Sequence, residues 1–252
     1  MSIPHLGIPP LTLLPSPLPS TALQVGRLIT KPAPSSPSSY LNPSRILIDQ
    51  DYDDVGHRWY KDVVRVSSVP NKDTKKDGVV FEQSLGASLL IPEKDRPTKE
   101  GEELGTIESE EVIVRMLKDP TAALNKIFQN EEGKTWLQNI IKSGQNNDVY
   151  MITALRTVKA ASYKRAALIP AGPQKGLWEV VRYVPEGEGE EEDIRHTGQG
   201  KGKKRRDSGL EVDTGSKWDV VGVEIRRVEM DGEGGGVRVG EVVGEEEGRG
   251  MF

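Results

Sequence analysis

Few side chains in this sequence have the type and spacing that catalysis or metal binding requires. The three histidines, His5, His57 and His196, are far apart, and the chain has no cysteine. The sequence contains no HExxH, GxSxG, phosphate-binding P-loop or dinucleotide glycine motif. The lack of cysteine excludes disulfides, thiolate metal sites and cysteine nucleophiles. We therefore expect a protein that is not an enzyme and uses no cofactor.

The clearest acidic cluster lies beside Gly56 and consists of Asp49, Asp51, Asp53 and Asp54. A calcium-binding EF-hand loop that began at Asp49 would need a glutamate at its twelfth position, where this chain has Tyr60. Runs of like charge usually lie in solvent. We therefore interpret the cluster as a solvated acidic loop and predict no metal site.

Basic residues offer a different chemistry, the binding of anionic groups. The densest basic run consists of Lys201, Lys203, Lys204, Arg205 and Arg206. Such a run is typical of a nuclear import signal, a nucleic-acid contact or an anionic lipid contact, and also of a solubilising loop balanced by the acidic run 186–193. The whole chain has 34 Lys and Arg against 39 Asp and Glu, a net charge of −5, so we expect no nucleic-acid partner.

Hydrophobic alternation, the pattern of a strand with one apolar face, is strongest over 79–91. The apolar face of this stretch consists of Val79, Phe81, Leu85, Ala87, Leu89 and Ile91. Ser84, Gly86 and Ser88 on the other face are small, which suits a water-filled lumen. The alternating stretch is longer than the usual five or six residues of a globular strand. It is also long enough to cross a bilayer as a tilted strand, which takes about 9–11 residues. A half-buried strand of an ordinary α+β protein has the same pattern.

Other segments supply the rest of the predicted fold. Asp119 and Pro120 begin a helix, because aspartate caps and proline loses no hydrogen bond at the first helical position. A second short helix is predicted from Thr135 to Ser143. Further strands are predicted at 23–30, 45–49, 60–69, 149–158, 177–184 and 218–228. The fold class is therefore α+β, a twisted, mostly antiparallel sheet with short helices inserted in the middle of the chain.

Amino-acid composition separates the predicted domain from two terminal segments of biased composition. Residues 1–20 are rich in proline and are predicted to form a disordered tail. Residues 21–230 are predicted to form a single domain that contains a mobile charged loop over 185–216. The tail 231–252 is rich in Gly and Glu, a composition typical of disorder, although an edge strand can form from Val237, Val239, Val242 and Val243.

Three segments resemble a known family. The passage from Lys134–Lys142 into Asn147–Leu155 resembles the gasdermin pore-forming domain, where a helix precedes a strand of the type xLYVVTxxx. The segment Asp219–Ile225 is similar to the family's late xxGVIELxV strand, and 79–91 occupies the position of its first membrane-inserting hairpin. The resemblance is greatest to short fungal gasdermin-like proteins, which act in programmed cell death and heterokaryon incompatibility. The family's basic amphipathic first helix is not visible, since the chain begins with the proline-rich tail.

The resemblance implies a gasdermin N-domain-like fold and a protein that oligomerises on anionic membranes and opens a pore. The implied partners are anionic phospholipid and further copies of the chain, or a related allelic partner. The chain would be cytoplasmic until it assembles at the plasma membrane. Membrane insertion requires assembly because no strand edge can face lipid.

The hairpins expected to insert are 60–69 with 79–91, and 149–161 with 177–184. The second of them would carry Tyr150, Ile152 and Ala154 into the membrane. The expected headgroup contacts are the basic run 201–206 and, near the tip of the second hairpin, Lys159, Lys164 and Arg165.

An alternative fits the same residues. It is a soluble intracellular interaction protein of this fold class, without membrane activity, which the run 201–206 directs to the nucleus or to a partner. The pore interpretation also gives the acidic tail a role, because anionic lipid repels it and it can cover a surface needed for oligomerisation. A chain that stops at Met230 is then expected to be more lytic than the full chain.

Overall fold

The computed structural model describes residues 11–31, 40–69, 78–97, 102–142, 148–172, 176–182, 210, 212, 214–230 and 237–244. Chain contacts divide the protein into two compact units that interleave along the sequence. Unit 1 consists of residues 1–59, 109–160 and 214–252, and unit 2 of residues 60–108 and 161–213. A single domain was predicted over 21–230. No change of composition marks the division into units at Trp59 and Glu108, because both boundaries fall inside strands.

The fold is a mostly antiparallel β-sheet with two short helices, and this confirms the predicted α+β class. The strands are β1 (Thr12–Pro19), β2 (Leu28–Lys31), β3 (Tyr40–Leu41), β4 (Tyr52–Val69), β5 (Gly78–Gly86), β6 (Leu90–Pro92), β7 (Glu102–Leu117), β8 (Asp148–Lys159), β9 (Ser162–Pro170), β10 (Leu177–Arg182), β11 (Trp218–Met230) and β12 (Val237–Val242). The helices are α1 (Pro120–Gln129) and α2 (Glu131–Lys142). Neither is long and apolar enough to cross a membrane, and the described residues contain no other α-helix.

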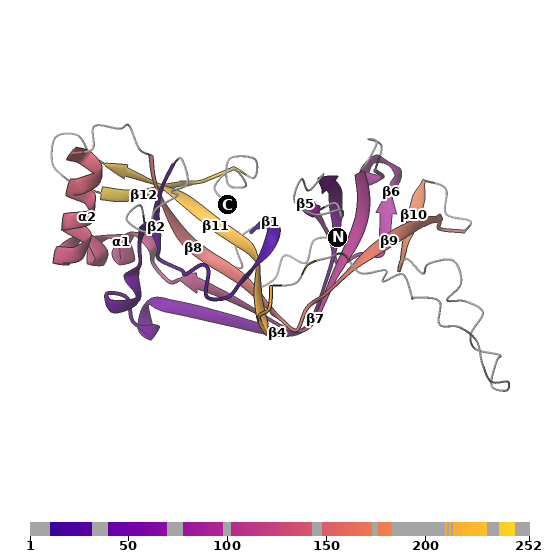
Figure 1. The fold of residues 1–252 in the computed structure, drawn as a ribbon, viewed down its shortest axis with the longest axis horizontal. Helices are drawn as coiled ribbons and strands as arrows, with labels where there is room; N and C mark the ends of the chain where they lie inside the picture. The colour runs from indigo at the N-terminus through magenta and orange to yellow at the C-terminus, as the bar shows by residue number, and fades with distance from the viewer. Residues whose placement is uncertain are drawn as a thin grey trace. The chain divides into compact units, whose positions relative to one another are not determined.

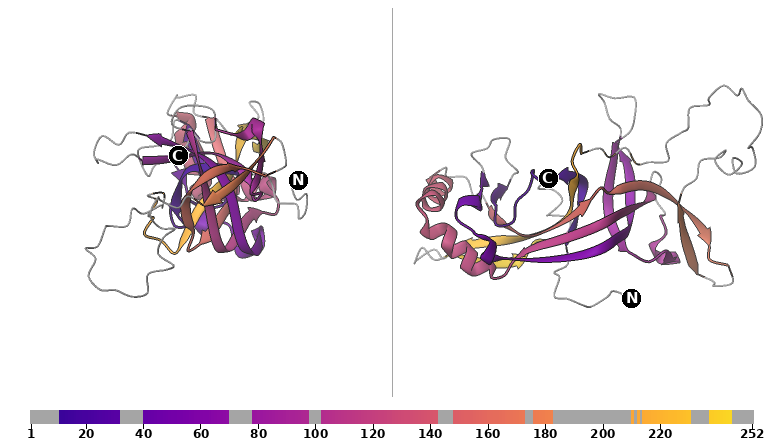
Figure 2. Two further views of the ribbon diagram at one scale, coloured as in Figure 1. Left: turned by 90° about the vertical axis from the view of Figure 1, so that its right-hand side faces the viewer. Right: turned by 90° about the horizontal axis from the view of Figure 1, so that it is seen from below.

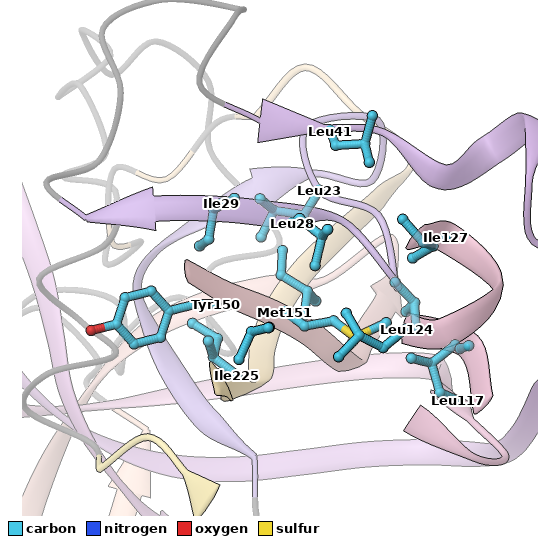
Figure 3. Packing of buried hydrophobic residues seen from close by; sticks show 14 of the residues in the cluster. Leu23, Leu28, Ile29, Leu41, Leu117, Leu124, Ile127, Tyr150, Met151 and Ile225 are labelled. Atoms are coloured by element: carbon cyan, nitrogen blue, oxygen red, sulfur yellow. The ribbon is translucent and has the colours of Figure 1, made fainter. Parts of the chain in front are cut away.

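In unit 1 the strands follow the order β1, β11, β8 and the second part of β7, with β12 paired to β11 and β2 to β8. Figure 1 shows α1 and α2 beside β12 and the ends of β8 and β11. Strand β8 is central, and Val149–Leu155 is buried without interruption, so both faces of the strand are covered. Figure 3 shows its core, where Tyr150 and Met151 lie among Leu28, Leu124 and Ile225.

The two helices follow local signals, and one of these signals, the cap at Asn130, was not predicted. The Asp119 carboxylate accepts a hydrogen bond from the Ala122 N–H at 2.9 Å, so the predicted cap of α1 is confirmed. Helix α2 begins at Glu131 rather than at Thr135, because the Asn130 side chain accepts from the Glu132 N–H and starts the helix earlier. Its Trp136 is buried, as the apolar pattern predicts.

Both biased tails contribute strands to unit 1. Within the predicted disordered tail 1–20, residues Thr12–Pro19 instead form β1, which pairs with β11 and buries Leu13 and Leu14. Its prolines are tolerated because β1 ends the strand order, where no partner needs their missing N–H. In the tail 231–252, β12 pairs antiparallel with β11, so the predicted edge strand is confirmed.

In unit 2 the first part of β7 pairs with β9, β9 with β10, and β10 with β6. The second part of β4, residues 60–69, pairs with β5, and Figure 2 shows β4 and β7 as long neighbouring strands. The described part of unit 2 buries fewer apolar side chains than that of unit 1: Val63, Val64, Val66, Phe81, Ile91, Leu104, Ile107, Tyr163, Val180 and Leu210. The Phe81 and Tyr163 rings lie 5.9 Å apart.

Candidate functional site

The first predicted hairpin forms, but its second strand is interrupted. Strands β4 and β5 pair antiparallel from Val63 opposite Gly86 to Val69 opposite Gly78, so the predicted pairing is confirmed. The single strand predicted over 79–91 is wrong, because β5 ends at Gly86 and β6 begins at Leu90. Gly86 has a φ of +87°, a conformation that ends the extended pattern and that glycine adopts without strain.

The break divides the predicted membrane-facing side chains among different environments. Val79, Phe81 and Leu85 lie on β5, with Phe81 fully buried. Ala87 and Leu89 are exposed in the turn, and Ile91 is buried on β6, which pairs with β10.

A buried carboxylate holds the break in place. Asp62 on β4 is 2% exposed and accepts hydrogen bonds from the Ser84 hydroxyl at 2.8 Å, the Gly86 N–H at 3.1 Å and the Tyr60 hydroxyl at 2.9 Å. Hydrogen bonds to a charged acceptor are roughly twice as strong as neutral ones. The Asp62 cluster (Tyr60, Asp62, Ser84 and Gly86) therefore fixes the end of β5.

The second predicted hairpin is wrong in its pairing. Strand β10 pairs with β9 and β6, whereas β8 pairs with β11, β7 and β2. The reason is the chain at Ala160, whose φ of +47° separates β8 from β9. Tyr150, Ile152 and Ala154, expected in the membrane-inserting hairpin, are at most 1% exposed in the core of unit 1.

The basic side chains near 160 do not lie at a hairpin tip. Lys159 ends β8 and forms an ion pair of 2.6 Å with Glu111. Lys164 and Arg165 lie within β9, opposite Thr106 and Gly105 of β7, and Arg165 is ion-paired with Glu103. That Lys159, Lys164 and Arg165 contact lipid headgroups stays a prediction. The basic run Lys201, Lys203, Lys204, Arg205 and Arg206 lies outside the described residues, as does most of the loop 185–216.

The acidic cluster beside Gly56 is tied to basic residues from distant parts of unit 1. Asp54 accepts two hydrogen bonds of 2.7 Å from Arg115, and these lower the pKa of its carboxyl. Asp51 accepts a hydrogen bond of 2.7 Å from Lys126, which likewise lowers its pKa. The interpretation as a merely solvated loop therefore missed its ion pairs, because their partners lie more than 60 residues away in the sequence.

A cleft of about 590 Å³ in unit 1 is the other candidate site, and no motif in the sequence pointed to it. Its lining residues, named here the Trp59 cleft, are Gly56, His57, Arg58, Trp59, Glu110, Glu111 and Lys159. Trp59 has a φ of +64° and its side chain is 77% exposed. Lys159 also lies 5.6 Å from the centre of the Trp218 ring.

Three exposed apolar side chains, Leu89, Leu90 and Ile169, lie on or next to strands that pair with β10 in unit 2. Glu179 of β10 lies between Leu90 of β6 and Ile169 of β9, so the three residues share one face. Leu90 and Ile169 are each 43% exposed, and Leu89 beside them is 39% exposed. The exposed Glu179 separates Leu90 from Ile169, so this face lacks the contiguous apolar patch that marks a surface for a protein or a membrane.

No protein-family model matches this chain, and no curated protein matches it.

Proposed function

We propose that this protein is a gasdermin-like pore former that inserts strands of unit 2 into a membrane while the core of unit 1 stays folded. The observation that carries the proposal is the length of two paired strands. Strand β4 has 18 residues and β7 has 16, and both strands run from unit 1 into unit 2. The part of β4 in unit 2, residues 60–69, has the length of about 9–11 residues that crosses a bilayer. Globular strands usually have five or six residues.

The distribution of buried apolar side chains supports unit 2 as the part that rearranges. One of its clusters consists of only four buried residues, Val63, Ile91, Leu104 and Val180. Burial of an aliphatic side chain contributes about 1.5–3 kcal/mol, so this cluster contributes on the order of 10 kcal/mol. Contact with lipid tails replaces that contribution, because lipid is as apolar as the protein interior.

The interrupted strand supports the same proposal. Apolar and polar residues alternate through 79–91, although the folded chain turns at Gly86. A continuous strand over these residues would bring Phe81, Leu85, Ala87 and Leu89 onto one face, as a lipid-facing strand requires. The apolar alternation therefore extends over 79–91, whereas the strand β5 of the folded chain ends at Gly86.

One observation favours the alternative of an interaction protein without membrane activity. Tyr150, Ile152 and Ala154 are buried in the core of unit 1, so β8 cannot enter a membrane unless that core unfolds. The pore proposal therefore does not use β8 as an inserted strand, contrary to the expectation from the sequence.

Dye leakage from liposomes with anionic lipid tests the proposal through two neighbouring substitutions. Ala87 and Ser88 are both exposed, so a lysine at either position leaves the folded core intact. In a continuous strand Ala87 faces lipid and Ser88 faces the lumen. A lysine facing lipid costs about 2–4 kcal/mol at the bilayer midplane.

We expect Ala87→Lys to abolish leakage and Ser88→Lys to retain it. Circular dichroism of both variants checks that they fold. Equal leakage from the two variants would contradict the insertion of 79–91, and absence of leakage from the unmodified chain would favour the interaction protein.

A further inference from the structure

We propose that the Trp59 cleft binds the headgroup of a choline phospholipid, with the quaternary ammonium on the Trp59 ring and the phosphate on Arg58. This inference rests on the proposed membrane function and names one lipid chemistry that the protein recognises. All residues that line the cleft belong to unit 1.

The backbone at Trp59 is the first observation. A φ of +64° is rare for a bulky residue, and such a conformation costs on the order of 1–3 kcal/mol. In a regular strand only alternate side chains share a face, yet four consecutive residues, Gly56 to Trp59, line this cleft. The left-handed conformation at Trp59 breaks the alternation there, so that Trp59 lines the same cleft as its neighbour Arg58.

The exposure of the ring is the second observation. Trp59 is 77% exposed, whereas Trp136, on α2, is 8% exposed in the core of unit 1. A tryptophan that is both strained and exposed contributes little to folding. Its ring is free to stack on a cation, and tryptophan is the best of the aromatic side chains for this contact.

The charges around the ring are the third observation. Arg58 and Glu110 are exposed and take part in no ion pair among the described residues, whereas Lys159 is bound to Glu111 at 2.6 Å. The cleft thus combines two cations, Arg58 and Lys159, with two carboxylates, Glu110 and Glu111, and the formal charges of these four groups cancel. This pattern is complementary to a zwitterion.

A ligand with one positive and one negative charge can bind both Glu110 and Arg58. The Arg58 guanidinium matches the geometry of a phosphate, and the Glu110 carboxylate attracts an ammonium that lies on the ring. A headgroup with only negative charge would meet repulsion from Glu110. The volume of about 590 Å³ lies within the range of small-molecule sites and exceeds what phosphocholine needs.

Soluble phosphocholine tests the site without a membrane. Saturation-transfer NMR on the full chain detects contact with the choline methyl protons at millimolar ligand. Choline chloride and inorganic phosphate are titrated separately, so that a headgroup site is distinguished from a site for either half alone. We expect phosphocholine to bind at least tenfold more tightly than either.

Two variants assign the binding to the cleft. Trp59→Asn removes the ring and keeps the left-handed backbone, which asparagine adopts readily. Glu110→Gln removes the charge that faces the ammonium. Each is expected to weaken phosphocholine binding at least tenfold, whereas Ile48→Ala, at an exposed residue outside the cleft, leaves it unchanged.

Equal saturation transfer in Trp59→Asn and the unmodified chain would overturn the proposal, as would tighter binding of phosphate than of phosphocholine. The result is separable from the proposed function. Phosphocholine binding without liposome leakage would refute the pore and keep the site, and leakage without phosphocholine binding would refute the site alone.

Discussion

Replacement of Asp62 by alanine should open the end of β5 without unfolding unit 1. The substitution leaves the Gly86 N–H and the Ser84 hydroxyl without the acceptor they have at 3.1 and 2.8 Å. Both donors are half-buried, and the Gly86 N–H keeps a second acceptor, the Ser84 hydroxyl at 3.3 Å. We therefore expect a cost of about 1.5 kcal/mol, near the lower end of the range for an orphaned buried donor. Each 1.4 kcal/mol is a factor of about ten, so the local opening constant should rise about tenfold.

Hydrogen exchange of the Gly86 amide measures this opening directly, and amides of β8 report on unit 1 in the same sample. Gln83→Ala is a matched control, because Gln83 is an exposed neighbour on the same strand and should change exchange little. Unchanged protection of Gly86 in Asp62→Ala would refute the role of the carboxylate. Equal loss of protection in β8 would show that the cluster supports the whole chain rather than the break.

Three other predictions concern unit 1. Hydrogen bonds from Lys126 and Arg115 lower the pKa values of Asp51 and Asp54, so both carboxylates stabilise the folded chain when they are ionised. This stabilisation is complete above about pH 4, the pKa in the unfolded chain, and is lost as the pH falls through the lower pKa values of the folded chain. Acid unfolding followed by circular dichroism should therefore be less steep in the Asp51→Asn/Asp54→Asn double variant. Gly133→Ala should lower stability by about 3 kcal/mol in urea unfolding, because its Cβ would lie 2.1 Å from a carbonyl oxygen of α1. A chain that stops at Met230 lacks β12 and exposes the paired edge of β11, so it should melt at a lower temperature and cause more leakage than the full chain.

Local signals in the sequence predicted the elements that depend on nearby residues. The Asp119 cap, the strand at 149–158 and the pairing of 60–69 with 79–91 follow from capping, alternation and a short connection. The fold class follows from the same signals. Edge strands in biased segments are harder to predict, because β1 owes its formation to a partner, β11, some 200 residues away in the sequence.

The candidate sites depended on features that periodicity does not encode. Nothing in the residues around Trp59 requires a positive φ there, so the cleft was not predicted. The carboxylates at Asp51 and Asp54 have their partners on α1 and β7, and only the folded chain brings them together. Alternation predicted one strand over 79–91 because a period of two does not register a single left-handed glycine.

Gly86 therefore offers the sharpest test of whether the break in this strand matters for function. A Cβ at Gly86 would meet nothing within 4 Å, so Gly86→Ala creates no clash. Its φ of +87° nevertheless disfavours alanine by about 1 kcal/mol relative to an extended conformation. The substitution should shift the segment toward a continuous strand by about fivefold, since 1 kcal/mol is close to that factor.

The proposed pore requires the continuous strand, so Gly86→Ala should leak dye faster than the unmodified chain at equal concentration. Gly172→Ala is the matched control, because Gly172 also has a positive φ, of +53°, and open space at its Cβ, but lies beyond the end of β9. Gly172→Ala therefore places alanine at a similarly unfavourable positive φ but leaves the turn at Gly86 unchanged. If the two alanine variants leak at the same rate, the turn at Gly86 does not limit insertion, and the alternation through 79–91 has no consequence beyond the fold of unit 2.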